Sequence, residues 1–248
     1  MVELSKEELQ YYSRQIMMEE IGAKGQLKLK NSKVCVVGLG GLGSPVAMQL
    51  AGMGVGHLRI VDGDFVDVTN LHRQHLYGVD KKGMSKVDAA TERLRKLNPY
   101  IVIEPVKTLV NKTNAKEIIQ TMNVVVDGLD NMEARYAVNR ECVKLGVPYV
   151  FGAVATTTGN VSTIVPEKTV CLECFYGNKS KSESEIVGVH PSAVNIIASL
   201  EVSETIKLLT GQEPCLVNKL LNFDLNGLEI NLVPLSKVDS CPVCGPNS

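Results

Sequence analysis

The sequence predicts an α/β fold: a Rossmann-like mixed sheet with a parallel N-terminal half and antiparallel C-terminal additions. Up to about residue 155, short continuous apolar segments alternate with helical segments, which is typical of a parallel sheet covered on both faces. A glycine-rich turn joins the first apolar segment to a helix. After residue 155 the alternation ends, and Asn226-Gly227 joins two strand-like segments, which predicts an antiparallel hairpin.

The N-terminal half contains the elements of the parallel sheet. Ser5 and Glu8 form a capping box that predicts a helix through about residue 20, within an N-terminal helical segment over residues 1–30. Ser44 and Pro45 suit a helix start after the glycine turn. We expect strands at 33–37, 57–61, 101–105, 124–127 and 149–153, and helices at 45–53, 86–97, 114–120 and 131–145.

The C-terminal part contains different elements. We expect a strand at 161–165, a helix at 192–209, and a hairpin of strands 219–224 and 228–233. Residues 175–190 are rich in Ser, Lys, Glu and Gly, which predicts a mobile crossover loop. A chain of 248 residues is long enough for one large α/β domain, and there are no internal repeats, so we expect one domain spanning residues 1–248.

Composition excludes several classes of protein. Hydrophobic residues make up 44% of the 248 residues and charged residues 21%, which is ordinary for a globular domain. The net charge of -1 gives no global reason to expect nucleic-acid binding. The polar start lacks a secretory signal, and no apolar run could span a membrane, so we expect a cytoplasmic protein. Seven cysteines in a reducing compartment suggest thiols or metal ligands.

The glycine-rich turn matches a nucleotide-binding fingerprint. Gly38-x-Gly40-x-x-Gly43 lies between an expected strand and helix, where glycines let the backbone approach a phosphate. Asp62 ends the next strand, in position to accept hydrogen bonds from ribose hydroxyls. A tight turn without a ligand is the structural alternative. The motif does not distinguish ATP from NAD.

The polar residues that follow favour ATP over NAD. Asn70, Arg73, Gln74 and Lys86 come after Asp62, and Asp130 lies just beyond the strand at 124–127, where ligands bind in open α/β sheets. A carboxylate that attacks the α-phosphorus of ATP is already ionised, with a pKa of about 3.5, so it needs no general base. It needs cations on the phosphates and Mg²⁺ held by an aspartate.

Each of these side chains has an alternative explanation when taken alone. Arg73 and Lys86 are equally explained as solvated surface charges, and Asp130 as the cap of the helix at 131–145. The loop histidines His72 and His75 are assigned no role. The combination of residues therefore supports an adenylation site, and no single residue does.

The ordered motifs resemble one known family over essentially the whole chain. GLGGLG, the aspartates Asp62 and Asp64, NLxRQ at 70–74, SK at 85–86, DGLDN at 127–131 and the paired CxxC motifs resemble the ubiquitin-activating-like (ThiF/MoeB/HesA) adenylyltransferases. The MoeB and ThiF types, which act on sulfur-carrier proteins, are the most similar. The resemblance implies adenylation, with pyrophosphate release, of the terminal Gly-Gly carboxylate of a small β-grasp carrier of the MoaD/ThiS type, ahead of thiocarboxylate formation.

The same resemblance implies roles for individual residues. Asp62 would bind the ribose, Asp130 would bind Mg²⁺, and Arg14 would reach the ATP site of the neighbouring subunit in a homodimer. Arg14, Arg73, Lys86 and Asp130 would be catalytic. The nucleotide site would comprise Gly38, Gly40, Gly41, Gly43, Asp62, Asp64, Asn70, Arg73, Gln74, Lys86, Asp130 and Asn131.

The crossover loop of this chain differs from that of several members of the family, which have a cysteine there. Residues 175–190 contain none. Cys35 lies in an expected core strand and Cys142 on an expected helix, so Cys215 is the remaining thiol to test. We therefore expect adenylation without a covalent sulfur step. The chain also ends soon after Cys244, so we expect a separate sulfurtransferase as sulfur donor.

Four cysteines form two matched pairs. Cys171-x-x-Cys174 and Cys241-x-x-Cys244 are the usual halves of a tetrahedral Zn²⁺ site. Four thiolates leave no coordination position for water, so the zinc would be structural. Four free thiols or a redox-active CxxC are the alternatives.

Three other functions remain open. An NAD-dependent Rossmann oxidoreductase would use the same glycine turn. A zinc-stapled scaffold would bind a partner without turnover. An enzyme that activates a small-molecule or tRNA-linked carboxylate would use the same chemistry. The sequence also leaves open the pathway served: molybdopterin, thiamine, tRNA thiolation or protein modification.

Overall fold

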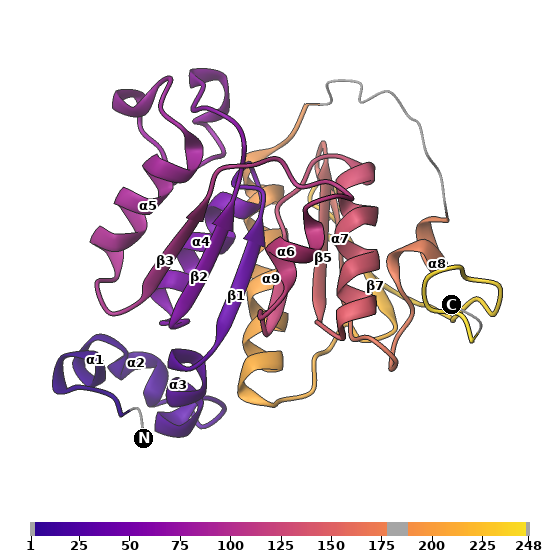
Figure 1. The fold of residues 1–248 in the computed structure, drawn as a ribbon, viewed down its shortest axis with the longest axis horizontal. Helices are drawn as coiled ribbons and strands as arrows, with labels where there is room; N and C mark the ends of the chain where they lie inside the picture. Colours follow the sequence, from indigo (N-terminus) through magenta and orange to yellow (C-terminus); the bar gives the residue numbers. More distant parts are fainter. Residues whose placement is uncertain (1–2, 178–187, 247–248) are drawn as a thin grey trace.

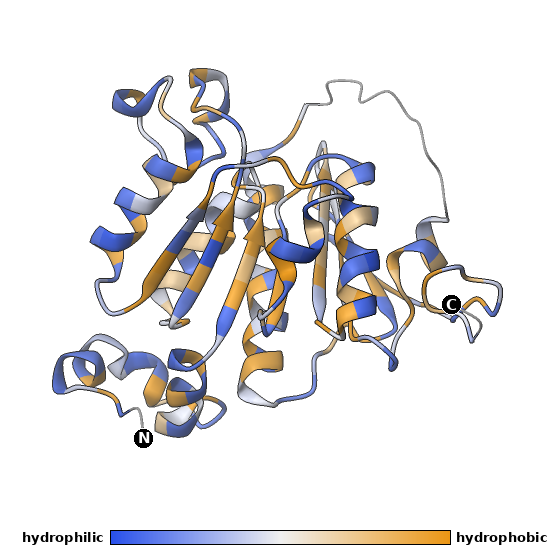
Figure 2. Cartoon of the chain, in the orientation of Figure 1, coloured by the Kyte–Doolittle hydropathy of each residue, from blue (hydrophilic) through white to orange (hydrophobic). Residues whose placement is uncertain are grey.

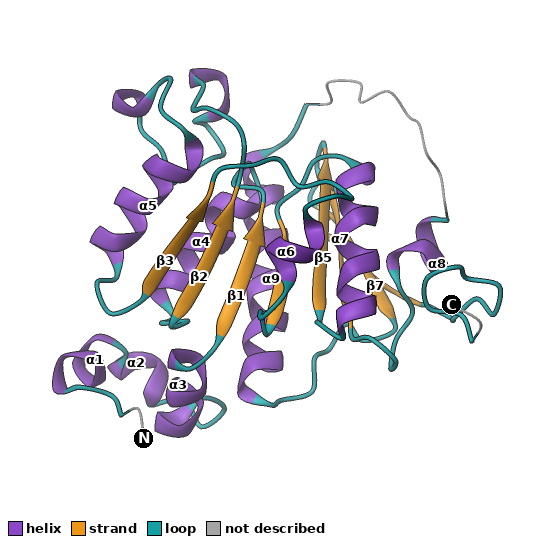
Figure 3. Ribbon diagram, viewed as in Figure 1, coloured by secondary structure: helices purple, strands orange, loops and turns teal. Residues whose placement is uncertain are grey.

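A computed structural model describes residues 3–177 and 188–246. Its centre is an eight-stranded sheet in the order β3-β2-β1-β4-β5-β6-β7-β8 (Figures 1 and 3). The strands from β3 to β5 run parallel, and β6, β7 and β8 are antiparallel additions, which confirms the predicted fold class. The strands are β1 Lys33–Val37, β2 His57–Val61, β3 Val102–Val106, β4 Val124–Asp127, β5 Tyr149–Ala155, β6 Thr158–Ile164, β7 Lys219–Asp224 and β8 Glu229–Pro234.

Helices cover both faces of the parallel strands. Along β1, Val34 and Val36 pack into one core, whereas Cys35 and Val37 pack into the other, because successive side chains point to opposite faces. The strands drawn in Figure 2 are accordingly mostly apolar, with polar residues such as Lys33 at the start of β1 and Arg59 within β2. The first core is shared with α4 Gly43–Gly52, α5 Lys86–Leu97 and α9 Pro191–Thr210, and the second with α6 Ala115–Ile119 and α7 Met132–Leu145.

The N-terminal segment differs from the single helix predicted through about residue 20. It forms α1 Lys6–Tyr11, α2 Ser13–Ile16 and α3 Gly22–Lys30. The capping box of Ser5 and Glu8 is present. The helix breaks at Tyr12, whose buried ring reaches into the core and whose hydroxyl accepts a hydrogen bond from Asn98 Nδ2 (2.8 Å). Burial of this ring overrides the local helical pattern.

The third helix lies within the predicted helical segment of residues 1–30, although no separate helix was predicted there, and it contains two glycines, Gly22 and Gly25. A Cβ on Gly25 would lie 3.3 Å from Ile21 Cγ2 and 3.5 Å from Thr210 Cγ2. The glycine therefore permits close packing of α3 against the end of α9, which a propensity argument does not detect.

The C-terminal half also departs in detail from the prediction. Strand β6 starts three residues earlier than expected, because it pairs with β5 across a two-residue turn in which Thr156 has a φ of 53°. The short helix α8 Leu172–Tyr176 was not predicted, and its last two residues belong to the expected loop. Residues 178–187 of the expected mobile loop lie outside the described residues. The hairpin of β7 and β8 has a four-residue turn.

The carboxyl ends of the five parallel strands meet at one edge of the sheet, and the glycine turn follows β1 there. Helices α1 to α3 lie at the opposite edge (Figure 1). Two short 3₁₀ turns, Val68–Asn70 and Val79–Lys81, belong to the long connection between β2 and α5. None of the described helices combines the length and apolar character that a membrane span requires.

Candidate nucleotide site and cysteine cluster

The glycines of the turn divide into two kinds. Gly38 has a φ of 88°, and a Cβ there would lie 2.4 Å from the carbonyl oxygen of Gly128. A Cβ on Gly43 would lie 1.8 Å from the carbonyl oxygen of Gly38, so both positions require glycine for backbone packing. Gly40 and Gly41 are open, since an added Cβ would meet nothing closer than 3.6 Å. These two glycines leave a surface to which a ligand can approach closely.

Asp62 binds the backbone of the glycine turn. Its Oδ2 accepts a hydrogen bond from Leu39 N–H (2.7 Å), and its Oδ1 accepts one from Asp64 N–H (2.8 Å). Only 7% of the residue is exposed, and this burial raises the pKa of the carboxyl although the two hydrogen bonds oppose the shift. Asp62, which we predict to bind the ribose, therefore also fixes the shape of the glycine turn.

Asp64 and Lys86 form an ion pair beside Asp62. Lys86 Nζ lies 2.9 Å from Asp64 Oδ2. An antiparallel bridge between Phe65 and Ser85 places the two side chains opposite each other, and Lys86 N–H donates to the Asp64 carbonyl (3.0 Å). Lys86 is only 6% exposed, so the alternative that it is a solvated surface charge is wrong.

Arg73 and Gln74 lie over the open glycines. A Cβ on Gly41 would be 3.6 Å from Arg73 Cδ and Nε, and one on Gly40 would be 3.8 Å from Gln74 Nε2. Asn70 orients the guanidinium, because its Oδ1 accepts a hydrogen bond from Arg73 Nη2 (2.9 Å). The structure therefore brings these three predicted residues together at the turn.

Gln74 also has an unused hydrogen-bonding atom. The residue is 3% exposed, yet its Oε1 has no partner among the described residues. A buried amide oxygen without a partner is unfavourable by about 1 to 3 kcal/mol, so such an atom indicates a place for a ligand or a water molecule.

Asp130 extends from the loop after β4. Asn131, and not Asp130, is the cap of α7, since its Oδ1 accepts a hydrogen bond from Ala134 N–H (2.9 Å). The capping alternative for Asp130 is therefore wrong. Among the described residues, its exposed carboxylate meets only a weak donor, Asn131 Nδ2 at 3.4 Å. Gly128 packs against Gly38, which places this loop beside the glycine turn.

Arg14 is not brought to this site by its own chain. The side chain is exposed on α2, at the edge of the sheet opposite the glycine turn (Figure 1). A role for Arg14 at a nucleotide site therefore requires a second copy of the chain.

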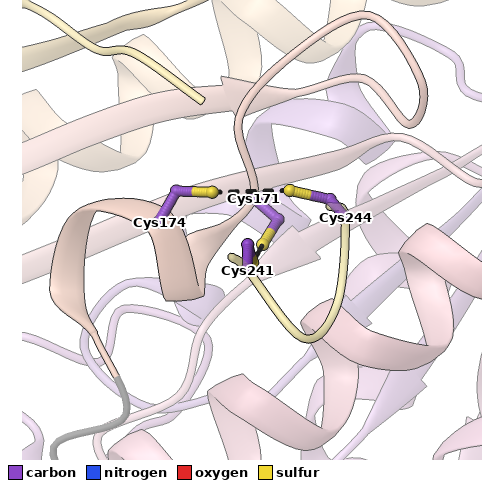
Figure 4. Close-up of side chains that lie close together, drawn as sticks. All are labelled: Cys171, Cys174, Cys241 and Cys244. Carbon is purple, nitrogen blue, oxygen red and sulfur yellow. Dashed lines mark hydrogen bonds between the residues drawn. The ribbon is translucent and has the colours of Figure 1, made fainter. Parts of the chain in front are cut away.

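The four paired cysteines converge, as predicted. Their Sγ atoms all lie within 4.8 Å of one another, with 3.5 Å between Cys171 and Cys241 and 3.4 Å between Cys174 and Cys244 (Figure 4). Sulfurs at the corners of a zinc tetrahedron are about 3.8 Å apart. Burial raises the pKa of Cys171 and, to about 11, that of Cys244, so a cation would have to displace protons on binding. The donor set and its compactness fit zinc.

The other three cysteines lie outside the site. Cys35 and Cys142 are fully buried, and burial raises the pKa of Cys35 to about 12, so neither thiol is reactive. Cys215 is exposed and accepts a hydrogen bond from Lys207 Nζ (3.1 Å). It follows the C-terminal end of α9, whereas Val194 near the start of that helix lies by Gly41.

Sequence reasoning did not detect some residues that shape the site. Ser44 Oγ accepts a hydrogen bond from Leu76 N–H (2.9 Å), and Tyr77 Oη donates to the Leu39 carbonyl (3.0 Å). These two bonds join the segment of Arg73 and Gln74 to the glycine turn. The sequence contained no indication of them, because both cross between segments more than thirty residues apart.

Comparisons with known proteins give matches over most of the chain. A family model described as the ThiF family matches residues 12–243. The chain is 37% identical to a SAMP-activating enzyme E1 of Haloferax volcanii, with 98% of the chain and 91% of that protein aligned. It is also 37% identical to a sulfur carrier protein adenylyltransferase of Thermus thermophilus, covering 97% of the chain and 92% of that protein.

Other relatives are longer. The chain is 38% identical to the adenylyltransferase and sulfurtransferase MOCS3 of Culex quinquefasciatus, but it spans only 57% of that protein's length. Among solved structures, E. coli MccB with ATP matches with a TM-score of 0.81 at 27% identity, over 89% of this chain and 69% of MccB. MccB with MccA-N7isoASN matches with a TM-score of 0.86 at 26% identity, over 97% and 75%.

Proposed function

Because the chain belongs to the ThiF family, we propose that it adenylates the C-terminal Gly-Gly carboxylate of a small β-grasp sulfur-carrier protein, using ATP. A carboxylate oxygen of the carrier forms a bond to the α-phosphorus of ATP. The bond from that phosphorus to its bridging oxygen breaks, and pyrophosphate leaves with the electron pair. The carrier adenylate is then ready for a separate sulfurtransferase to form the thiocarboxylate.

The residues around the glycine turn suit this reaction. The attacking carboxylate is already ionised, so the site must offset the repulsion between two anions and hold them in line. Arg73 and Lys86 supply positive charge, and Asn70 keeps the guanidinium in one orientation. Mg²⁺, which Asp130 would hold, adds charge neutralisation on the phosphates.

The observation that carries the proposal is the position of Arg73 and Gln74 against Gly41 and Gly40. In a dinucleotide-binding site the backbone and helix N-terminus suffice for the pyrophosphate. Here a cation, the Arg73 guanidinium, lies over the open glycines, which supports a triphosphate and a second substrate over NAD.

Two further features belong to the proposal. We propose a homodimer, because Arg14 lies too far from its own site and would serve the partner's site. We also propose that the four cysteines hold a structural Zn²⁺, since no coordination position would remain for a substrate. The absence of a cysteine at residues 175–190 supports adenylation without a covalent sulfur step.

The test is ATP–pyrophosphate exchange with each Gly-Gly carrier that the source organism encodes. The protein should exchange label only when a carrier is present, and Asp130→Ala or Arg73→Ala should lower the rate by about a hundredfold or more. A carrier that lacks its final glycine is the negative control. Exchange without any carrier would indicate a small-molecule carboxylate, and NADH affinity without ATP affinity would overturn the proposal.

A further inference from the structure

Asp130 is exposed, so the direction of its carboxylate depends on the backbone that precedes it. That backbone is held at Leu129 from both sides. Leu129 N–H donates to Asp127 Oδ1 (2.8 Å), and the Leu129 carbonyl accepts a hydrogen bond from Arg135 Nη2 (2.6 Å). One residue earlier, Gly128 N–H donates to the Val37 carbonyl at the end of β1 (2.7 Å).

Arg135 is itself fixed in the core and does not face the phosphates. Its Nε donates to Asp127 Oδ2 (2.9 Å), and Nη2 also donates to the Gly152 carbonyl on β5 (2.9 Å). The guanidinium lies 5.4 Å from the centre of the Phe151 ring, and the residue is 7% exposed. Tyr149 Oη donates to Asp127 Oδ2 (2.7 Å), which completes the buried pair.

The planar fork of arginine matches this arrangement. Two guanidinium nitrogen atoms, Nε and Nη2, have fixed relative positions. Together they donate to the Asp127 carboxylate and to the carbonyl oxygens of Leu129 and Gly152. A lysine ammonium could retain the charge pairing with Asp127, but it has no rigid fork to reach Leu129 and Gly152 as well. The geometry therefore needs arginine for its shape and not only for its charge.

We propose that Arg135 is a positioning residue that, through Leu129, aims the Asp130 carboxylate at the nucleotide-bound divalent cation. The inference rests on the proposed function, in which Asp130 holds that cation. Residues behind a metal ligand commonly change metal affinity by about 10- to 100-fold when they are altered. Arg135 lies behind Asp130 in this way, because it binds the carbonyl of Leu129, the residue before Asp130.

The test measures divalent-cation binding directly. Mn²⁺ affinity is measured by electron paramagnetic resonance on the full-length protein with a non-hydrolysable ATP analogue, and exchange is measured across a Mg²⁺ titration. Arg135→Lys should raise the Mn²⁺ dissociation constant and the half-saturating Mg²⁺ concentration about tenfold or more. The matched control is Arg140→Lys on the same helix, where the arginine pairs with Glu173 (2.8 Å) far from the loop. It should leave both values unchanged.

The outcomes separate the two proposals. If Arg135→Lys lowers the melting temperature but leaves Mn²⁺ affinity unchanged, Arg135 is only structural and the inference is wrong. If the variant does not fold, Tyr149→Phe decides, since it removes one hydrogen bond to Asp127 and should weaken Mn²⁺ binding about twofold to fivefold. Normal Mn²⁺ affinity in folded Tyr149→Phe would then overturn the inference. If the wild-type protein shows no exchange with any carrier, the proposed function fails instead.

Discussion

At the residue scale, the glycine turn illustrates how one motif combines two requirements. Gly38 and Gly43 permit the backbone of the turn to pack on itself and on Gly128. Gly40 and Gly41 instead leave open the surface beneath Gln74 and Arg73. The motif alone does not separate these tasks, because all four residues are the same amino acid. The two tasks are distinguished by the atoms that an added methyl group would meet at each glycine.

This difference predicts that two alanine substitutions affect different properties: Gly43→Ala the stability, and Gly41→Ala the KM for ATP. Gly43→Ala would place a methyl carbon 1.8 Å from the Gly38 carbonyl oxygen, so we expect a loss of about 3 to 5 kcal/mol in stability. Gly41→Ala meets only ordinary contacts at 3.6 Å, so its stability should change by less than about 1 kcal/mol. Its KM for ATP should nevertheless rise about tenfold, because the methyl group keeps phosphate from the backbone. Urea unfolding and exchange kinetics measure both effects, and equal stability of the two variants would contradict the prediction.

At the element scale, α9 contains two buried glutamates one turn apart with opposite environments. Both carboxylate oxygens of Glu201 are without a partner among the described residues, and burial, followed by the charge of Asp127, raises its pKa well above the ordinary value. Burial would also raise the pKa of Glu204, but hydrogen bonds from Lys207, Leu216 N–H, Cys215 N–H and Thr163 lower it below the ordinary value. Burial without a partner therefore favours the neutral form of Glu201, whereas the hydrogen bonds favour the ionised form of Glu204.

The two glutamates should respond to pH with opposite signs. The folded state keeps the Glu201 proton that the unfolded chain releases above a pH of about 4.3, so the contribution of Glu201 to stability falls as pH rises. Glu201→Gln should remove this loss, making the variant more stable at pH 7 but not below pH 4. The Glu204 carboxylate stabilises above the unfolded pKa and loses this effect as pH falls. Glu204→Gln should therefore cost about 2 to 4 kcal/mol at pH 7, and less in acid. Denaturant unfolding from pH 4 to 8 tests both, and shifts of the same sign would refute the prediction.

At the scale of the whole molecule, distant parts of the chain are joined at two places. The cysteine cluster connects the segment after β6 to the C-terminal segment, seventy residues away. The N-terminal helices lie at the edge of the sheet opposite the glycine turn, so Arg14 is remote from the site in its own chain (Figure 1). Each place leads to a prediction about the intact protein.

The cluster should contain one zinc ion per chain. Cys241→Ser or a strong chelator should remove it and lower the melting temperature by about 5 °C or more, because the metal restrains the C-terminal segment. The control is Cys215→Ser, which alters an exposed thiol outside the cluster and should keep the zinc. Elemental analysis with calorimetry measures both, and a metal-free wild type of the same stability would disprove the assignment.

Arg14 should act across a subunit interface. Arg14→Ala and Asp130→Asn should each abolish exchange in separate preparations. In a random mixture, half of the dimers are mixed and one of their two sites is intact, so about a quarter of wild-type activity should return. Mixing two preparations of Arg14→Ala is the control and should restore none. No recovery in confirmed mixed dimers would place Arg14 outside the partner's site.

The sequence by itself determined the features that depend on neighbouring residues. The alternation of apolar segments and helices gave the parallel sheet in its correct class, since strand and helix periodicities are local. The glycine motif, the polar motifs and the paired cysteines indicated the family and the convergence of the four thiols, both of which are confirmed. The roles assigned to the nucleotide-site residues, and the zinc itself, stay predictions.

Only the tertiary structure decided which polar residues face the site and which support it. In the sequence, Arg135 is another cation near Asp130, but in the structure it is buried and paired with Asp127. Helix α3 and the break at Tyr12 likewise depend on contacts with distant residues. The physical reason is that burial is a property of the assembled molecule. Whether a charged or glycine residue faces solvent, a ligand or the core depends on chain segments far away in the sequence.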